Sequence, residues 1–405
     1  MRRSRPAPVP PPALPRPGRG VRSGRPRGAA LPLLAGLLAA GVIATALAVL
    51  PARNVPAADP PPPAAQPIEP PIAAGPPCAP IVGAMSVRQR LAQRLMVGVD
   101  AADPAATAEL VRSSQVGGVF LGGNATALLR DGALARVQEA ASVPVWVAVD
   151  DEGGRVQRID DLDGELPSAA RMAATMTPEQ VRALERARGE QLKARGVTTD
   201  LAPVVDLGGQ PRTAVIGDRA FSTDPATVTR YAGAFAAGLR DAGVLPVFKH
   251  FPGHGRADGD SHKGRVSTPP IQQLRAADLR PYSELLPAGT AAVMVGHLDV
   301  PGLTSGLPTS LTPATYALLR GELGFDGVVM TDDLGAMKAV TGRFGLADAV
   351  RTALDAGADV ALWSNPAPPA TVLDDLEAAL ARGELDAAAN DRAVTRILIA
   401  KGRCA

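Results

Sequence analysis

The stretch Val244-Leu245-Pro246-Val247-Phe248-Lys249-His250-Phe251-Pro252-Gly253-His254-Gly255 joins an apolar run to a polar loop. Residues 244–248 are predicted to form a short buried strand, and the Pro and Gly residues that follow end it. Three of the chain's four histidines fall in this loop or just after it: His250, His254 and His262. In an α/β barrel, polar groups that follow the C-terminal end of a strand lie on the functional face. The concentration of polar side chains behind one strand therefore indicates a site.

Seven other apolar runs have the length and composition of buried strands. They are residues 95–99, 118–121, 143–149, 201–204, 291–295, 327–330 and 360–363. Helical patterns separate most of them, at residues 125–140, 178–194, 225–242, 271–286, 313–323 and 346–356, and a last helix is expected at 386–401. Strands that alternate with helices indicate parallel strands joined by crossover helices. We therefore predict an α/β fold, a single (β/α)8 TIM-type barrel over residues 85–405. A doubly wound sheet is the alternative, but no G-x-G-x-x-G follows the first strand.

The residues before the barrel have a different composition. Residues 1–28 are rich in Arg and Pro, residues 29–50 carry no charge, and residues 51–80 are rich in Pro and Ala. The apolar segment is long enough to span a bilayer, and the Pro-rich segment is typical of an extended spacer. The Arg-rich tail is expected to stay in the cytoplasm, which places everything after residue 50 outside. The apolar segment is either a membrane anchor, which we favour, or a cleaved signal peptide.

Charge argues against a nucleic-acid partner, and the cysteines argue against a zinc site. The formal net charge is +2 and aromatic residues make up 3% of the chain. Much of the basic excess lies in the first 28 residues, so we expect no nucleic-acid partner. The two cysteines, Cys78 and Cys404, flank the predicted barrel and belong to no C-x-x-C motif, which argues against a zinc site. In an oxidising compartment we expect them to form a disulfide that joins the two ends of the barrel, and two free thiols are the alternative.

Ionisable residues follow several of the predicted strands. They are Asp150 to Arg158 after the third strand, Asp206 and then Arg219 after the fourth, Lys249 and His250 in the fifth, His297 and Asp299 after the sixth, and Asp332 and Asp333 after the seventh. All of these strand ends meet on one rim of a barrel. So many donors and acceptors in one place suit a substrate that is rich in hydroxyl groups.

Displacement at a sugar carbon needs a carboxylate nucleophile and an acid/base group on the other side. Asp332 or Asp333 can supply the first, and only one of two neighbours in an extended segment faces the barrel axis. Asp260 and His262 can form an acid/base pair in which the carboxylate orients the imidazole, because a histidine titrates near neutral pH. The histidines do not match H-E-x-x-H, so we predict no metal site. No G-x-S-x-G motif is present for a serine nucleophile.

These residues also carry a family resemblance. Lys249 to Gly255 (KHFPGHG), followed by Asp260-Ser261-His262, resembles the signature of glycoside hydrolase family 3 in its β-N-acetylhexosaminidase branch. Asp150 to Arg158 (DDEGGRVQR) is similar to that branch's D-Q-E-G-G-R-V-Q-R, with Asp151 in place of Gln. Residues 216–221 resemble its I-G-x-R-x-F segment, and residues 331–334 resemble its S-D-D-L segment, with Thr331 in place of Ser. Four motifs in the right order, from about residue 85 to the C-terminus, make the resemblance specific.

The resemblance implies a role for each matching residue. Asp332 would be the nucleophile, and His262 the acid/base with Asp260 as its partner. The residues implied to bind the sugar are Asp150, Arg158, Arg219, Lys249 and His250, whereas His254 and Asp333 would be structural. The implied enzyme is a retaining, exo-acting β-N-acetylglucosaminidase that needs no cofactor. Its implied substrates are peptidoglycan fragments with terminal N-acetylglucosamine, which an outward-facing monomer would meet at the cell wall.

Two alternatives remain. The first keeps the chemistry and changes the substrate: a β-glucosidase-like hydrolase, or a phosphorylase that uses phosphate in place of water, since a histidine acid/base would not repel phosphate as a carboxylate would. The second is a catalytically inactive module that binds the cell wall from a membrane stalk. Formation of sugar-1-phosphate would indicate the phosphorylase, and binding without turnover would indicate the module.

Overall fold

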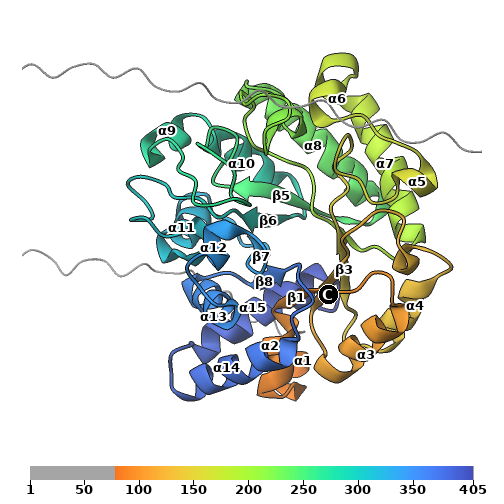
Figure 1. Cartoon of the computed structure of the whole chain (residues 1–405), viewed down its shortest axis with the longest axis vertical. Helices are drawn as coiled ribbons and strands as arrows, with labels where there is room; N and C mark the ends of the chain where they lie inside the picture. The colour runs from red at the N-terminus through yellow and green to blue at the C-terminus, as the bar shows by residue number, and fades with distance from the viewer. Residues whose placement is uncertain (1–77, 405) are drawn as a thin grey trace, which may run out of the picture. The chain divides into compact units, whose positions relative to one another are not determined.

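A computed structural model describes residues 78–404 of the chain, which form a closed barrel of eight parallel strands in sequential order (Figure 1). The strands are β1 (Leu95–Gly98), β2 (Gly118–Phe120), β3 (Trp146–Val149), β4 (Thr199–Asp200), β5 (Leu245–Phe251), β6 (Ala292–Val295), β7 (Val329–Asp333) and β8 (Val360–Trp363). Strand β8 pairs with β1 through Leu95 and Ala361, which closes the ring. The predicted (β/α)8 barrel is confirmed, and the open doubly wound sheet is excluded by this closure.

Helices surround the barrel and connect its strands (Figure 1). The α-helices are α1 (Ala79–Ala84), α2 (Val87–Gln93), α3 (Pro104–Ser114), α4 (Ala133–Glu139), α5 (Asp160–Asp163), α6 (Ala169–Thr175), α7 (Pro178–Ala194), α8 (Pro225–Ala242), α9 (Ile271–Ala276), α10 (Leu279–Leu285), α11 (Pro313–Ala317), α12 (Lys338–Thr341), α13 (Leu346–Ala356), α14 (Pro369–Ala381) and α15 (Ala387–Ala400). Short 3-10 turns η1 (Ala127–Leu129), η2 (Gly217–Arg219), η3 (Leu286–Ala288) and η4 (Thr309–Leu311) and a π-helical turn η5 (Leu318–Glu322) complete the connections.

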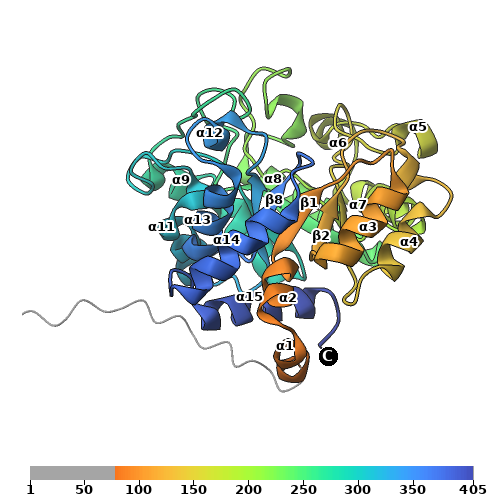
Figure 2. The same cartoon turned by 60° about the horizontal axis from the view of Figure 1, so that its bottom comes forward.

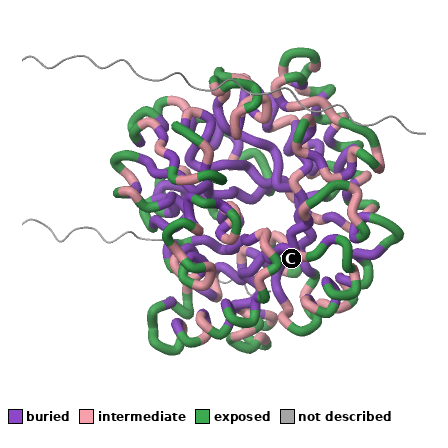
Figure 3. Tube along the Cα trace, viewed as in Figure 1, coloured by how far each residue is buried: buried purple, intermediate pink, exposed green. Residues whose placement is uncertain are grey.

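The core has two layers, as expected when side chains alternate between the two faces of a barrel strand. Inside the barrel, large apolar side chains fill the axis, among them Met96, Trp146, Met294 and Leu362. The opposite strand faces pack against the surrounding helices and form the larger of the two clusters. Figure 3 shows buried residues along the strands and exposed residues on the outer turns. This packing makes the barrel a rigid base for the loops at its carboxyl ends.

Two predicted segments differ from the structure in an informative way. The fourth strand was expected at 201–204, but β4 is Thr199–Asp200. Both residues are polar, and both are buried. Asp200 is tolerated there because its side chain accepts a hydrogen bond inside the fold. The single helix expected at 271–286 is divided into α9 and α10. Pro281 explains the division, because proline has no backbone N–H to donate to the carbonyl four positions earlier, which is that of Ala277.

The helix expected at 125–140 is also interrupted. Asp131 and Gly132 both have positive φ, at 51° and 66°, so η1 ends before them and α4 begins after them. The helices expected at 178–194, 225–242 and 346–356 have the predicted bounds. Thr177 and Asp224 cap the first two through their side chains, and a proline follows each cap.

The two ends of the described chain meet at the amino-terminal end of the barrel. Cys78 and Cys404 form a disulfide with a Cα–Cα distance of 5.2 Å, and α1 packs against α15. Figure 2 shows α1 and α15 at one end of the barrel and α12 at the opposite end. None of the helices within residues 78–404 is long and apolar enough to cross a membrane. The segment predicted as an anchor or signal peptide, residues 29–50, lies outside the described residues.

Candidate active site

A pocket of about 630 Å³ opens at the carboxyl ends of the barrel strands. All eight residues that the sequence marks as catalytic or sugar-binding line it: Asp150, Arg158, Arg219, Lys249, His250, Asp260, His262 and Asp332. They come from strands β5 and β7 and from the loops that follow β3, β4 and β5. The fold therefore brings together side chains that are as far as 182 positions apart in the sequence, between Asp150 and Asp332.

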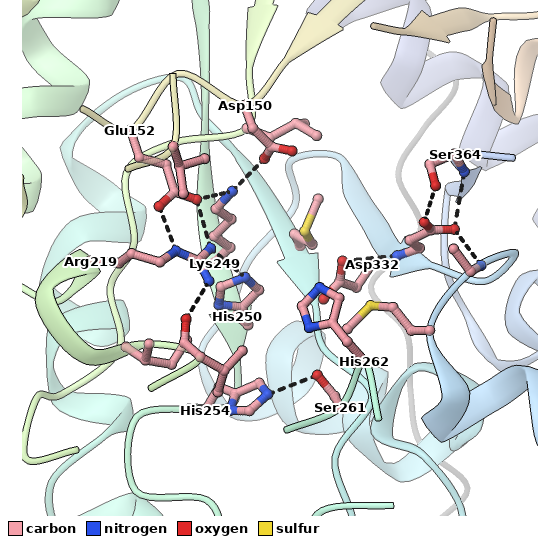
Figure 4. A pocket seen from close by; sticks show the side chains of 18 of the residues that line it. Asp150, Glu152, Arg219, Lys249, His250, His254, Ser261, His262, Asp332 and Ser364 are labelled. Carbon is pink, nitrogen blue, oxygen red and sulfur yellow. Dashed lines mark hydrogen bonds and ion pairs between the residues drawn. The ribbon is translucent and has the colours of Figure 1, made fainter. Parts of the chain in front are cut away.

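One wall of the pocket is a chain of alternating charges (Figure 4). The Lys249 ammonium lies 2.6 Å from Asp150 Oδ1 and 2.6 Å from Glu152 Oε1. Arg219 donates two hydrogen bonds to Glu152, from Nε at 2.6 Å and from Nη2 at 2.7 Å. Arg158 reaches the other oxygen of Asp150 at 3.6 Å. Three cations thus share two carboxylates, and this wall presents fixed donors and acceptors to a ligand.

Burial and pairing set the protonation of this wall in opposite directions. Burial acts to raise the pKa of the Glu152 carboxyl, but the Arg219 and Lys249 cations outweigh it and hold that pKa far below its usual range. Burial likewise acts to lower the pKa of Lys249, and the Asp150 and Glu152 carboxylates raise it above its usual value. Both groups therefore stay charged around neutral pH.

His250 is held by a carboxylate beneath it. Its Nδ1 lies 2.7 Å from Asp206 Oδ2, and the other oxygen of Asp206 accepts the backbone N–H of His254 at 2.6 Å. Burial acts to raise the pKa of the Asp206 carboxyl, but His250 and these hydrogen bonds lower it below its usual value. The bond at Nδ1 leaves Nε2 of His250 directed toward the pocket, 3.5 Å from Arg219 Nη2.

Asp332 and Asp333 at the end of β7 have different surroundings. Asp333 Oδ1 accepts the backbone N–H groups of Gly335, Ala336 and Ser364, so its carboxylate is committed to the adjacent loops. Asp332 is half-buried at the base of the pocket and accepts one hydrogen bond, from the backbone N–H of Asp333 at 2.9 Å. Asp332 is thus the member of the pair that remains available to a ligand.

Nearby positive charge keeps Asp332 ionised. Burial acts to raise the pKa of its carboxyl, but the histidines His250 and His297, the backbone N–H of Asp333 and the Lys249 ammonium lower it below its usual value. A carboxylate that is ionised, half-buried and without a cation in direct contact is suited to attack an electrophilic carbon.

His262 faces the pocket from a loop between β5 and α9. Asp260 Oδ1 lies 2.9 Å from His262 Nδ1 and also accepts the His262 backbone N–H at 3.0 Å. The imidazole remains 60% exposed, so its Nε2 is open to solvent and to a ligand. A hydrogen bond between His254 Nε2 and the Ser261 hydroxyl, and one from the Ala339 N–H to the Ser261 carbonyl, hold the loop. Figure 4 shows His262 and Asp332 on the same side of the pocket.

Sequence reasoning left two residues out of the site. Glu152 lies within the DDEGGRVQR segment and carries the charge that joins Arg219 to Lys249, and Asp206 follows β4 and orients His250. Their positions just after β3 and β4 indicated that both lie near the site. Their roles could not be predicted, because their partners follow or belong to other strands. Within residues 78–404 no group of three His, Cys, Asp or Glu side chains is arranged to hold a metal ion.

The sequence matches the model of the glycosyl hydrolase family 3 N-terminal domain over residues 86–400. The chain is 51% identical over 326 residues to the β-hexosaminidase LpqI of Mycobacterium tuberculosis, which covers 78% of this chain and 83% of that protein.

Two solved structures of family 3 enzymes superpose on this chain. A glycosyl hydrolase of family 3 from Mycobacterium smegmatis superposes with a TM-score of 0.77 at 50% identity, over 80% of this chain and 99% of that one. A family 3 β-N-acetylglucosaminidase from Paenibacillus sp. superposes with a TM-score of 0.74 at 31% identity, over 79% of this chain and 63% of that one.

Proposed function

Since the chain belongs to glycosyl hydrolase family 3, and is therefore a glycoside hydrolase, we propose that it is a retaining, exo-acting β-N-acetylglucosaminidase. Relatives that are named β-hexosaminidase or β-N-acetylglucosaminidase support this choice of sugar. The observation that carries the mechanism is the placement of the unpaired Asp332 carboxylate in one pocket with the bonded pair Asp260–His262.

In the first step, Asp332 attacks the anomeric carbon and forms a covalent glycosyl-enzyme. His262 Nε2 gives its proton to the glycosidic oxygen, which leaves with the rest of the substrate. In the second step, His262 takes a proton from water, and this water displaces Asp332 from the sugar with a second inversion. Asp260 holds the imidazole through Nδ1, so that Nε2 is the nitrogen that exchanges the proton.

The charged wall would bind the sugar's hydroxyl groups during both steps. Asp150 has an oxygen on Lys249 and a second one near Arg158, and it can accept from one or two hydroxyls. Arg219 and Lys249 can donate, and Nε2 of His250 can accept, because their carboxylate partners fix their orientation. Such fixed donors and acceptors stabilise charge in the transition state without having to reorganise.

We further propose that the natural substrates are peptidoglycan fragments with a terminal N-acetylglucosamine. The support is the sequence outside the described residues, where an apolar segment and a Pro-rich spacer would place a monomeric barrel outside the cytoplasm, at the cell wall. An oxidising location is also consistent with the Cys78–Cys404 disulfide.

Hydrolysis of an aryl β-N-acetylglucosaminide tests the reaction. Asp332→Asn should lose turnover by at least about 10³-fold, whereas Asp326→Asn, an exposed change just before β7, should retain it. His262→Ala should be slow on poor leaving groups, while an activated aryl leaving group should restore the first step. Equal loss with good and poor leaving groups would contradict the acid role of His262.

Two further measurements test the mechanism: the configuration of the sugar released, and whether water or phosphate receives it. NMR should show release of the β-anomer first, because two inversions retain configuration. Release of sugar-1-phosphate in phosphate buffer would instead identify a phosphorylase. Absence of turnover by the wild type, with binding to wall fragments intact, would identify a non-catalytic module.

A further inference from the structure

Four ionisable side chains are buried together behind the sugar-binding wall. Asp151, Glu185 and Asp200 are 0% exposed, and Arg188 is 1% exposed. Asp151 lies between the two wall carboxylates Asp150 and Glu152 in the sequence, Asp200 belongs to β4, and the other two lie on α7. None of the four lines the pocket, so the proposed mechanism does not use them.

Two of these carboxyls bind the backbone of the loop that carries the wall. Asp200 Oδ1 accepts the backbone N–H of Asp151 at 2.9 Å. Asp151 Oδ2 accepts the backbone N–H of Arg158 at 2.7 Å and that of Ile159 at 3.3 Å. The first bond fixes the point between Asp150 and Glu152, and the other two fix the point at which Arg158 leaves the loop.

Arg188 holds the same loop from the helix side. Its Nε lies 3.5 Å from Asp151 Oδ1, and its Nη2 donates to the Gly164 carbonyl at 2.5 Å. Glu185, in contrast, has no hydrogen-bond partner on either side-chain oxygen among the described residues. Glu185 is therefore in the cluster without binding the loop.

We propose that Asp151 and Asp200 are positioning residues, whose buried carboxyls set the loop backbone so that Asp150, Glu152 and Arg158 meet the sugar. The inference rests on the proposed sugar-binding role of that wall. Neither carboxyl reaches the pocket, and each acts through backbone N–H groups of the loop. The cluster would thus determine affinity for the sugar without taking part in bond breaking.

The charges of the cluster agree with this role. The cluster holds one guanidinium and three carboxyls, and burial raises the pKa of the Asp200 and Glu185 carboxyls well above the usual range. Burial also raises the pKa of Asp151, although Arg188 and the loop N–H groups act to lower it. The cluster can therefore be neutral overall, with Asp151 paired to Arg188, and a neutral cluster can remain dry behind the wall.

The two oxygens of Asp151 have different partners. Oδ2 accepts from the loop, and Oδ1 faces Arg188. Arg188 can therefore balance the charge of the carboxylate that holds the loop.

The test compares steady-state kinetics of full-length variants on the aryl β-N-acetylglucosaminide. Asp200→Ala and Asp151→Ala should each raise KM by about tenfold or more with a small change in kcat, because each removes an acceptor for a buried N–H. Asp200→Asn keeps an oxygen acceptor and should recover most of the affinity. Glu185→Ala is the matched control, since it opens the same cluster without releasing the loop, and it should keep the wild-type KM.

Amide hydrogen exchange gives a second readout that does not depend on turnover. Faster exchange at residues 151–159 in the two alanine variants, but not in Glu185→Ala, is expected. If all three alanine variants lower the melting temperature while KM and loop exchange stay at the wild-type values, the two carboxyls are structural and the proposal is overturned. If Asp200→Ala does not fold, Asp151→Ala and Asp200→Asn decide the outcome by the same measures.

Failure of the proposed function is recognised separately. A wild type that does not turn over the aryl sugar contradicts the proposed activity. Positioning is then read from the rise in melting temperature on adding N-acetylglucosamine, which the two alanine variants should lose and Glu185→Ala should keep. A wild type that shows neither turnover nor this rise overturns both proposals.

Discussion

Replacement of Glu152 by Gln removes one charge from the wall and leaves its shape almost unchanged. Glu152 is 4% exposed and accepts two hydrogen bonds from Arg219 while it pairs with Lys249. After the change, both cations remain buried, and Asp150 is the carboxylate left to pair with Lys249. Lys249 would then depend on Asp150 alone for a countercharge, which would make Asp150 a weaker acceptor for a sugar hydroxyl.

The loss of this charge should lower both the stability of the fold and the activity. Removing one partner of a buried ion pair typically costs about 3–5 kcal/mol, because the other charge stays buried without its partner. A domain of about 330 residues unfolds with an entropy of about 0.7 kcal/mol/K, so the melting temperature should fall by about 4–7 °C. On the aryl substrate, kcat/KM should fall at least about tenfold, which corresponds to about 1.4 kcal/mol of lost transition-state binding.

Calorimetry and steady-state kinetics measure the two effects, with Glu190→Gln as the control. Glu190 pairs with Arg186 on the exposed face of α7, and its loss should cost about 1 kcal/mol or less. A Glu152→Gln protein with the melting temperature of the control would show that Glu152 does not hold Arg219 and Lys249 in place. A normal kcat/KM would show that the wall does not bind the sugar.

Three further predictions concern the ends, the buried cluster and the base of the site. Replacing both Cys78 and Cys404 by Ala should lower the melting temperature in the absence of a reductant, and loop entropy over the 326-residue separation limits the loss in free energy of unfolding to about 6 kcal/mol. A variant that melts at the wild-type temperature without a reductant would contradict this. Glu185 keeps its proton in the folded state above the pH at which the unfolded chain loses it, so stability should fall as pH rises above about 4.5, by up to about 1.4 kcal/mol per pH unit. Glu185→Gln should remove the contribution of Glu185 to this slope, so the free energy of unfolding of the variant relative to the wild type should grow from pH 5 to pH 8. Asp206→Ala leaves His250 without its Nδ1 partner and should cost about 1–3 kcal/mol in unfolding free energy and raise KM, and wild-type values of both would refute the orienting role.

The sequence was most informative where local signals and tertiary packing agree. Helices α7 and α8 have their predicted bounds because Thr177 and Asp224 cap them. The prediction for β4 was wrong because its two polar residues lack the apolar signal of a strand, and Asp200 is accommodated through a bond to the Asp151 N–H of a neighbouring loop.

The site shows the same division between local and distant information. Motifs identified eight side chains that line one pocket, since each lies in or after the carboxyl-terminal part of a strand that the barrel brings to one rim. The partners of those side chains could not be predicted. Glu152 follows β3, Arg219 follows β4 and Lys249 lies in β5, so their pairing depends on strand register that no local pattern encodes.

The disulfide between Cys78 and Cys404 has a consequence for resistance to proteolysis. It makes the described chain a covalent ring, so one proteolytic cut between the two cysteines opens the ring without releasing a piece. A cut in the long connection between β4 and α8, for example, would separate Asp150 from Asp332 along the backbone, yet both would stay joined through Cys78 and Cys404. Because the two fragments could not diffuse apart, a nicked barrel would keep the parts of its pocket together.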